Sequence, residues 1–147
     1  PASARILAGP AYALLRSEFL AARDTALGRR DGNPVRSILI SLGATDPQLP
    51  ALRLFAEILG GGMASRLFQS AREERGLAYA IDAYQEPYED TGVLGIYAGA
   101  AADRAKELAE VSAVEVWALA EVGPTEKELS RAKAVMKAGL WMSDEPR

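Results

Sequence analysis

Apolar residues recur along the chain with two different periods, and each period predicts a different kind of element. The short apolar run of residues 37–42, rich in Ile and Leu and followed by Gly43, is typical of a strand that is buried on both faces. From residue 50 onward the apolar positions recur at i, i+3, i+4 and i+7, which predicts a helix. The run Gly60 to Gly62 ends that helix. Its inward positions are Leu52, Phe55, Ala56 and Leu59.

A second helix is predicted from Ser65, with Gly76 as its left-handed C-terminal cap. The glycines in front of it suggest phosphate binding at a helix N-terminus, but no Lys-Ser/Thr pair follows, so a hinge between two helices is favoured. Aromatic and β-branched residues then predict strands at 77–85 and 91–99, joined as a hairpin. The acidic link between them is either a weak cation site or a solvated loop, and its carboxylates are Glu86, Glu89 and Asp90.

Two long helices complete the pattern. The first is predicted over residues 103–122, and Thr125 with Glu128 forms an S/T-x-x-E capping box for the second. The order of elements predicts an α+β fold, with helix pairs packed on a small, largely antiparallel sheet. That sheet needs a third strand, so residues 37–42 are expected to pair with one strand of the hairpin. The last helix is expected to bury Leu129, Ala132, Met136 and Leu140.

Composition limits the chemistry that the chain can perform. Its 147 residues suit one domain, and a net charge of −3 argues against a nucleic-acid partner. There is no Cys and no His, which excludes thiol and imidazole catalysis and Cys-ligated zinc. No apolar stretch reaches the roughly 18 residues that span a membrane. We therefore expect no catalytic residue and no metal ligand in this chain, and no membrane partner.

Several segments, in the same order, resemble one family of enzymes. They are residues 59–69 (LGGGMASRLFQ), 72–79 (REERGLAY), 88–99 (YEDTGVLGIYAG) and 123–133 (GPTEKELSRAK). These motifs are similar to the C-terminal, non-zinc domain of pitrilysin/insulinase-type metallopeptidases, in the mitochondrial processing peptidase branch. The resemblance covers about residues 50–145.

The resemblance implies a non-catalytic, peptide-binding fragment with no activity of its own. In that family the zinc is held by an inverted H-x-x-E-H motif on another domain, so zinc would belong to a partner domain and no cofactor to this chain. The family's substrate-contacting Arg and Tyr match Arg72 and Tyr79. From the residues alone, the favoured interpretation is that Arg72 complements a helix C-terminus and Tyr79 fills a strand position. A free hairpin edge would also accept an extended peptide by strand addition.

The first third of the chain resembles a different family. Residues 9–19 and 38–47 are similar to a nucleotide-sugar hydrolase of the pseudaminic-acid pathway, from which Ala44 departs. That resemblance implies a nucleotide-facing loop, although a plain turn is the favoured interpretation because only one strand of a doubly wound sheet is present. The loop residues are Gly43, Thr45 and Asp46.

Together the two resemblances predict a chimera. Residues 1–36 are a foreign segment, partly helical or disordered, and residues 37–147 form the peptidase-like domain with strand 37–42 borrowed from that segment. Two alternatives stay open: an engineered or selected folded domain without biological function, and a remnant of a nucleotide-sugar hydrolase. Expected partners are a peptide, a zinc-bearing peptidase domain or a second copy, since exposure of Trp117 would favour oligomers. The expected location is the bacterial cytoplasm.

Overall fold

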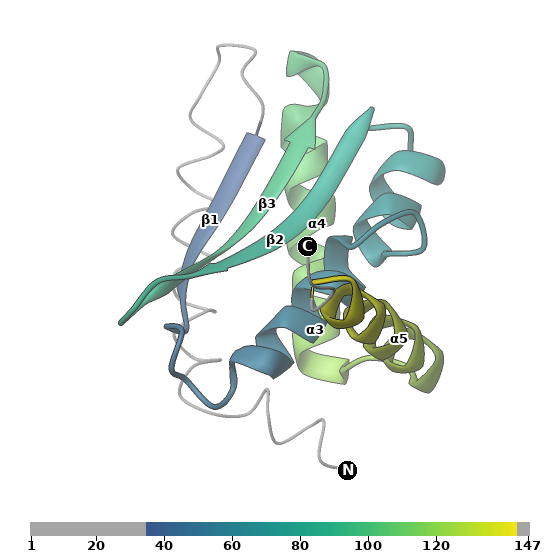
Figure 1. Ribbon diagram of the computed structural model, residues 1–147. Coiled ribbons are helices and arrows are strands. Elements are labelled where there is room, and N and C mark those ends of the chain that lie inside the picture. Colours follow the sequence, from purple (N-terminus) through teal and green to yellow (C-terminus); the bar gives the residue numbers. More distant parts are fainter. Residues whose placement is uncertain (1–34, 144–147) are drawn as a thin grey trace.

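A three-stranded antiparallel sheet forms the centre of the fold. The computed structural model describes residues 35–143, so the expectations for residues 1–34 lie outside the described part. The strands β1 (Val35–Ser41), β2 (Ala80–Pro87) and β3 (Gly92–Gly99) lie in the order β1-β3-β2 (Figure 1). The register places Leu39 opposite Leu94, which confirms that the apolar run of residues 37–42 pairs with the hairpin.

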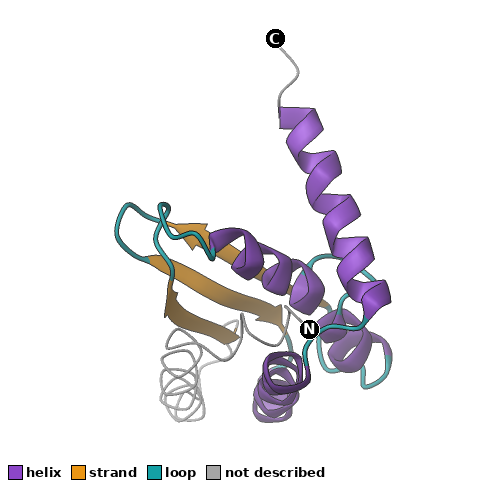
Figure 2. Cartoon of the chain, turned by 90° about the horizontal axis from the view of Figure 1, so that it is seen from below, coloured by secondary structure: helices purple, strands orange, loops and turns teal. Residues whose placement is uncertain are grey.

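Helical elements pack on one face of this sheet. In chain order they are α3 (Leu49–Gly60), the π-helical turn η1 (Phe68–Glu73), the 3-10 turn η2 (Ala102–Arg104), α4 (Ala105–Val122) and α5 (Glu126–Ser143). The fold is therefore α+β, as the order of elements predicts. Figure 2 shows that α5 leads away from the rest of the chain. Among the described residues, no helix is both long and apolar enough to cross a membrane.

The core lies on one face of the sheet. In β2 and β3 the side chains alternate between the two faces, because successive residues of a strand point to opposite sides. Buried residues of both strands belong to one apolar cluster with residues of α3, η1 and α4. The strand residues in this cluster are Ile81, Ala83, Leu94, Ile96 and Ala98. Asp82, at the alternate position of β2, is exposed.

The end of α3 is fixed directly against β2. A Cβ atom on Gly60 would overlap the backbone nitrogen and the side chain of Ala83. Only glycine therefore allows this close approach of helix and strand. Gly62 follows with a positive φ of 88°, and the next helical turn begins after Ser65. This geometry confirms the interpretation of the glycines as a hinge between two helices.

A partly buried ion pair connects that second helical turn to the start of α5. The Arg66 guanidinium donates to both carboxylate oxygens of Glu128, at 2.7 and 2.9 Å, and to the Gly123 carbonyl at 3.3 Å. Glu128 also accepts from the backbone N–H and the hydroxyl of Thr125, at 2.7 and 2.8 Å. This confirms the capping box, which here also anchors a tertiary contact. The hydrogen bond from Arg66 lowers the pKa of the Glu128 carboxyl to about 2.

The predicted core of α5 is wrong at its end. Ala132 is fully buried, and Leu129 and Met136 are half-buried, but Leu140 is 63% exposed. The apolar spacing is correct, but the second half of α5 leads away from the body of the domain, so this position is not buried there. The hairpin strands also differ from prediction, since β2 begins three residues later than expected, at Ala80.

Candidate functional site

The connection between η1 and β2 positions both residues that the peptidase resemblance singles out. The helical run ends in a Schellman motif: Leu77 N–H donates to the Ala71 carbonyl at 2.8 Å, and Gly76 N–H donates to the Arg72 carbonyl at 3.1 Å. Gly76 has a positive φ of 58°, as its predicted role requires. Leu77 is buried, which anchors the turn. Arg72 therefore lies just before this fixed turn and Tyr79 just after it.

Arg72 is exposed at the end of a π-helical turn. The Glu74 N–H donates to the Gln69 carbonyl at 2.9 Å, five residues back, which is the π-type hydrogen bond. The Arg72 guanidinium carbon lies 4.5 Å from the centroid of the Phe68 ring, and this cation–π contact orients the side chain. Among residues 35–143 no carboxylate pairs with Arg72. Its donors therefore remain available to a ligand.

Tyr79 lies at the beginning of β2, where its side chain is 73% exposed. Its backbone N–H donates to the Gly99 carbonyl at 3.0 Å. Its ring lies over Gly99, because a Cβ atom there would overlap the ring. The glycine thus lets an exposed aromatic ring lie flat against the end of β3. Both predicted contact residues are exposed at the same end of the sheet.

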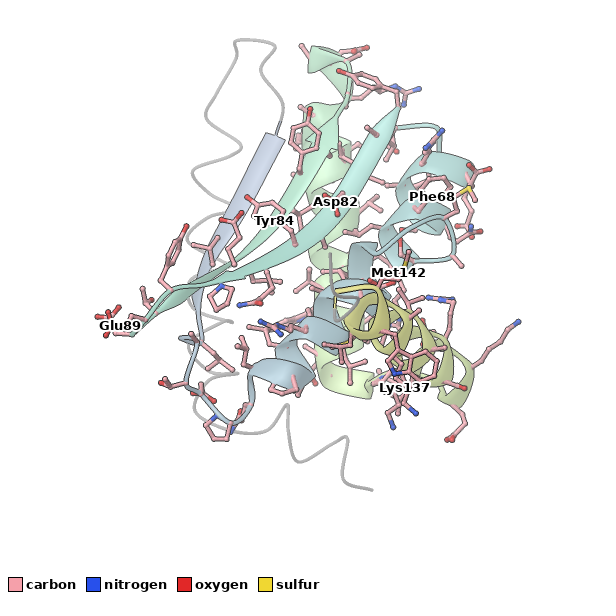
Figure 3. All side chains as sticks on the ribbon, viewed as in Figure 1. Phe68, Asp82, Tyr84, Glu89, Lys137 and Met142 are labelled. Carbon is pink, nitrogen blue, oxygen red and sulfur yellow. The ribbon has the colours of Figure 1, made fainter. Side chains whose placement is uncertain are left out.

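A second tyrosine on this sheet escaped the sequence reasoning. Tyr84 lies opposite Gly95 in the register, and its ring occupies the space that a Cβ atom of Gly95 would fill. Figure 3 shows Tyr84 and Asp82 on β2. A signal was present: glycine inside the strand 91–99 marks a place where another group approaches the backbone closely.

Glu57 of α3 is a half-buried carboxylate close to β2. Burial raises the pKa of the Glu57 carboxyl above its ordinary value; the charge of Arg131 opposes the rise and that of Asp82 adds to it. The Glu57 carboxylate lies against Gly61, where a Cβ atom would overlap it. Charges on β2 and α5 thus act on the Glu57 carboxyl beside the sheet, although none of these residues was predicted as a site residue.

The loop proposed for a nucleotide is a turn held by internal hydrogen bonds. Ala44 N–H donates to the Tyr88 carbonyl at 2.7 Å, and Asp46 N–H donates to the Gly43 carbonyl at 3.2 Å. The Asp46 carboxylate accepts from Gln48 N–H at 2.7 Å. Thr45 is exposed on the same turn. These backbone donors are already used, so the geometry favours the plain turn, and the nucleotide-binding role of Gly43, Thr45 and Asp46 stays a prediction.

No set of side chains among the described residues fits a zinc ion. The whole sequence lacks His and Cys, and residues 35–143 contain no group of three acidic side chains that could hold a metal. In the hairpin loop the Tyr88 hydroxyl donates to a Glu86 carboxylate at 3.3 Å. Figure 3 shows Glu89 at the tip of the hairpin, with its carboxylate directed outward. We therefore derive no metal-dependent step for this chain.

Residues 32–136 match the family described as Peptidase M16 inactive domain. This chain belongs to that family. The match includes β1 together with the rest of the sheet, so all three strands lie inside the M16 inactive domain. It also includes Arg72 and Tyr79 and the turn between them.

Relatives of known sequence are longer proteins. The uncharacterized zinc protease YmxG of Bacillus subtilis is 44% identical over 86 residues, which cover 58% of this chain and 21% of the relative. An uncharacterized zinc protease of Mycobacterium tuberculosis is 33% identical over 140 residues, which cover 86% of this chain and 32% of the relative. The chain thus spans between about a fifth and a third of these relatives.

Solved structures agree with the fold. The crystal structure of a peptidase M16 inactive domain from Pseudomonas fluorescens superposes with a TM-score of 0.65 at 29% identity, and covers 68% of this chain and 24% of its own. A protease from Helicobacter pylori superposes with a TM-score of 0.62 at 21% identity, covering 71% of this chain and 26% of its own. The second likeness concerns the fold alone.

Proposed function

We propose that this chain is the non-catalytic, peptide-binding part of a zinc protease, and that a separate domain holds the zinc. The observation that carries the proposal is the turn at Gly76, which presents Arg72 and Tyr79 at one end of the sheet in a member of the M16 inactive domain family. Relatives named as zinc proteases are several times longer than the chain, which leaves room for a zinc-bearing domain elsewhere in such proteins.

The two side chains suit the recognition of a peptide backbone. A guanidinium offers a fork of donors that binds a carbonyl or a carboxylate, and the Phe68 ring beneath Arg72 reduces the freedom lost on binding. The phenol of Tyr79 donates a hydrogen bond to a peptide carbonyl, or to an oxyanion that develops where a partner domain carries out the chemistry. Neither group performs hydrolysis, so we expect no peptidase activity from the chain alone.

Binding of a peptide as an extra strand along β2 has less support than binding at the end of the sheet, where Arg72 and Tyr79 lie. Gly60 of α3 lies against the backbone of Ala83, in the middle of β2, so the helix end crowds the centre of that strand. An added strand needs a continuous row of free backbone groups. We therefore restrict the proposed contact surface to Arg72, Tyr79 and the turn between them.

Peptide binding by the Arg72→Ala variant tests the proposal. Fluorescence anisotropy with labelled, unstructured peptides (one acidic, one neutral, one basic) measures the affinity of the 147-residue chain. We expect weak binding that falls about tenfold in Arg72→Ala, equivalent to about 1.4 kcal/mol, because a charge-assisted hydrogen bond is lost. Tyr79→Phe should lower the affinity by a smaller factor, since it removes only the hydroxyl.

Arg75→Ala is the matched control. Arg75 is exposed within the same turn, outside η1, and it carries the same charge. If Arg72→Ala and Arg75→Ala weaken binding equally, the effect is one of net charge and the proposed site is wrong. Affinity that is unchanged in both variants, or no binding by the parent chain, also contradicts the proposal.

The origin of the N-terminal segment in a second, unrelated family stays a hypothesis from the sequence. The family match begins at residue 32 and therefore includes β1, so the M16 domain accounts for this strand without a borrowed segment. The hypothesis then concerns residues before 32, where the resemblance to nucleotide-sugar hydrolases is carried by residues 9–19.

A further inference from the structure

The guanidinium of Arg72 lies away from the C-terminal end of its own helical run. Its carbon atom is 4.5 Å from the centroid of the ring of Phe68, which comes four residues earlier. Helical side chains lean toward the N-terminus of the helix, and this brings residues i and i+4 together. The carbonyls of Ala71 and Arg72 accept from backbone N–H groups of the following turn. Backbone groups thus close the end of the run, and the charge of Arg72 is directed away from it.

The surface on which this guanidinium lies is itself fixed. Phe68 is 9% exposed and belongs to the apolar core cluster. The backbone of Arg72 is held as well, because its carbonyl accepts from Gly76 N–H at 3.1 Å. A cation over an aromatic ring is attracted to the face of the ring. The ring therefore covers one face of the guanidinium, and the N–H groups, which lie in the guanidinium plane, stay directed to the sides.

The acidic residues nearest in sequence do not use these donors. Glu73 and Glu74 follow Arg72 directly, and residues one or two positions apart do not face each other on a helix. The ion pairs found among residues 35–143 join other side chains, and Arg72 takes part in none of them. Arg72 is exposed. A pair of in-plane N–H donors is thus held in place and open to solvent.

A carboxylate matches this pair of donors better than a peptide carbonyl does. Two parallel N–H groups of a guanidinium bind both oxygens of one carboxylate, whereas a carbonyl offers a single oxygen. A carboxylate also carries a full opposite charge. Because the Phe68 ring already restricts the Arg72 side chain, less conformational freedom is lost when both hydrogen bonds form.

We propose that Arg72 binds a carboxylate of the partner peptide, and that Phe68 is the residue that positions Arg72 for it. The inference rests on the proposed peptide-binding function and narrows it to peptides that offer a carboxylate to this site. That group is either the C-terminal carboxylate of the peptide or the side chain of an acidic residue. The guanidinium recognises the same planar group in both cases.

Matched peptides of one neutral, unstructured sequence test the proposal. One has a free C-terminus and one is amidated there, and two further amidated peptides carry a single internal Glu or Gln. All have acetylated N-termini, and fluorescence anisotropy with the 147-residue chain gives each affinity. We expect at least one carboxylate peptide to bind about tenfold more tightly than its neutral counterpart, and Arg72→Ala to abolish this preference. The pair of peptides that shows the preference identifies the source of the carboxylate.

Three substitutions separate the position of the guanidinium from its charge. Arg72→Lys keeps the charge but loses the fork of donors, so it should lose most of the carboxylate preference. Phe68→Leu removes the ring and keeps an apolar side chain, so it should reduce the preference about threefold. Phe68→Tyr keeps a ring and should retain the preference. A merely structural role of Phe68 would lower the stability of Phe68→Leu, measured by chemical denaturation, without changing the ratio between matched peptides.

Arg53→Ala is the matched control for net charge. Arg53 is exposed on α3, which follows the loop that is bonded to the Tyr88 carbonyl, so it lies toward the other end of β2 from Tyr79. An equal loss of preference in Arg53→Ala and Arg72→Ala would mean an effect of net charge and would overturn the proposal.

The remaining outcomes distinguish this inference from the proposed function. Equal binding of carboxylate and neutral peptides, with binding still weakened in Arg72→Ala, would overturn the inference and leave the proposed function standing. Binding that does not depend on Arg72, or no binding at all, would contradict both. An unchanged preference in folded Phe68→Leu would overturn the positioning role of Phe68.

Discussion

At the scale of single residues, the Glu128 carboxyl has a strongly perturbed environment. Arg66 and the Thr125 cap both donate to its carboxylate, and its pKa falls to about 2. A carboxyl whose pKa is lower in the folded than in the unfolded state stabilises the fold above the unfolded pKa. This contribution is lost as the pH falls through the folded value.

We therefore expect the free energy of unfolding to decrease between about pH 5 and pH 2, and Glu128→Gln to remove part of that decrease. At neutral pH the substitution should cost on the order of 2 kcal/mol, because it also leaves the partly buried guanidinium of Arg66 without its counter-charge. Urea unfolding at a series of pH values measures both effects. Glu126→Gln, on the exposed side of the same helical turn, should leave both the pH dependence and the neutral-pH value of the free energy of unfolding unchanged. Equal pH profiles for parent and Glu128→Gln would refute the argument.

The same residues show what sequence can predict at this scale. Thr125 and Glu128 carry the capping-box pattern, so their mutual hydrogen bonds were predictable from a spacing of three residues. The ion pair with Arg66 was not, because its partners are 62 residues apart and meet only once the fold has formed. Arg72 and Tyr79 were selected by resemblance; the Phe68 ring and the Gly99 backbone that orient them emerge only from the structure.

At the scale of elements, two glycines have opposite roles. Gly60 ends α3 where a Cβ atom would overlap the backbone of Ala83, whereas nothing lies within 4 Å of the Cβ position on Gly139, inside α5. Backbone cannot move aside as a flexible side chain can, so overlap at Gly60 forces α3 away from β2. At Gly139 a methyl group restricts the unfolded chain and improves the helix propensity.

Gly60→Ala should therefore lower the free energy of unfolding by at least about 2 kcal/mol, and Gly139→Ala should raise it by at most about 0.5 kcal/mol, because the end of α5 packs on little else. Chemical denaturation of the two variants beside the parent chain gives both differences, and each variant serves as the control for the other. A stability gain in Gly60→Ala would show that α3 does not approach β2 as closely as described.

Helix and strand types were predictable along the described chain because their apolar periods differ. The boundaries of the elements were less predictable. β2 begins at Ala80, because the apolar residues before it have other roles: Leu77 closes the cap of η1, and Leu77 and Ala78 are both buried in the core. The π-helical hydrogen bond from Glu74 to Gln69 was not predicted, because the run from Phe68 to Glu73 is too short for its apolar spacing to distinguish a π turn from an α turn. The exposure of Leu140 depends on where the neighbouring elements stop, which periodicity does not contain.

At the scale of the whole molecule, stability is unevenly distributed. α4 buries Leu108, Ser112, Val116 and Leu119 along most of its length. α5 buries Ala132 and partly buries Met136, and its described side chains after that position are all exposed. A helical segment without packing is marginal in water, so the last turns of α5 should open far more often than the rest.

Hydrogen exchange followed by mass spectrometry should show this difference directly. In dilute protein, amides of residues 137–143 should exchange with little protection, because their helical turns pack on little else, while those of α4 should exchange only as the domain unfolds. Equal protection of the two regions in dilute protein would contradict this prediction, since it would mean that the domain itself stabilises the end of α5.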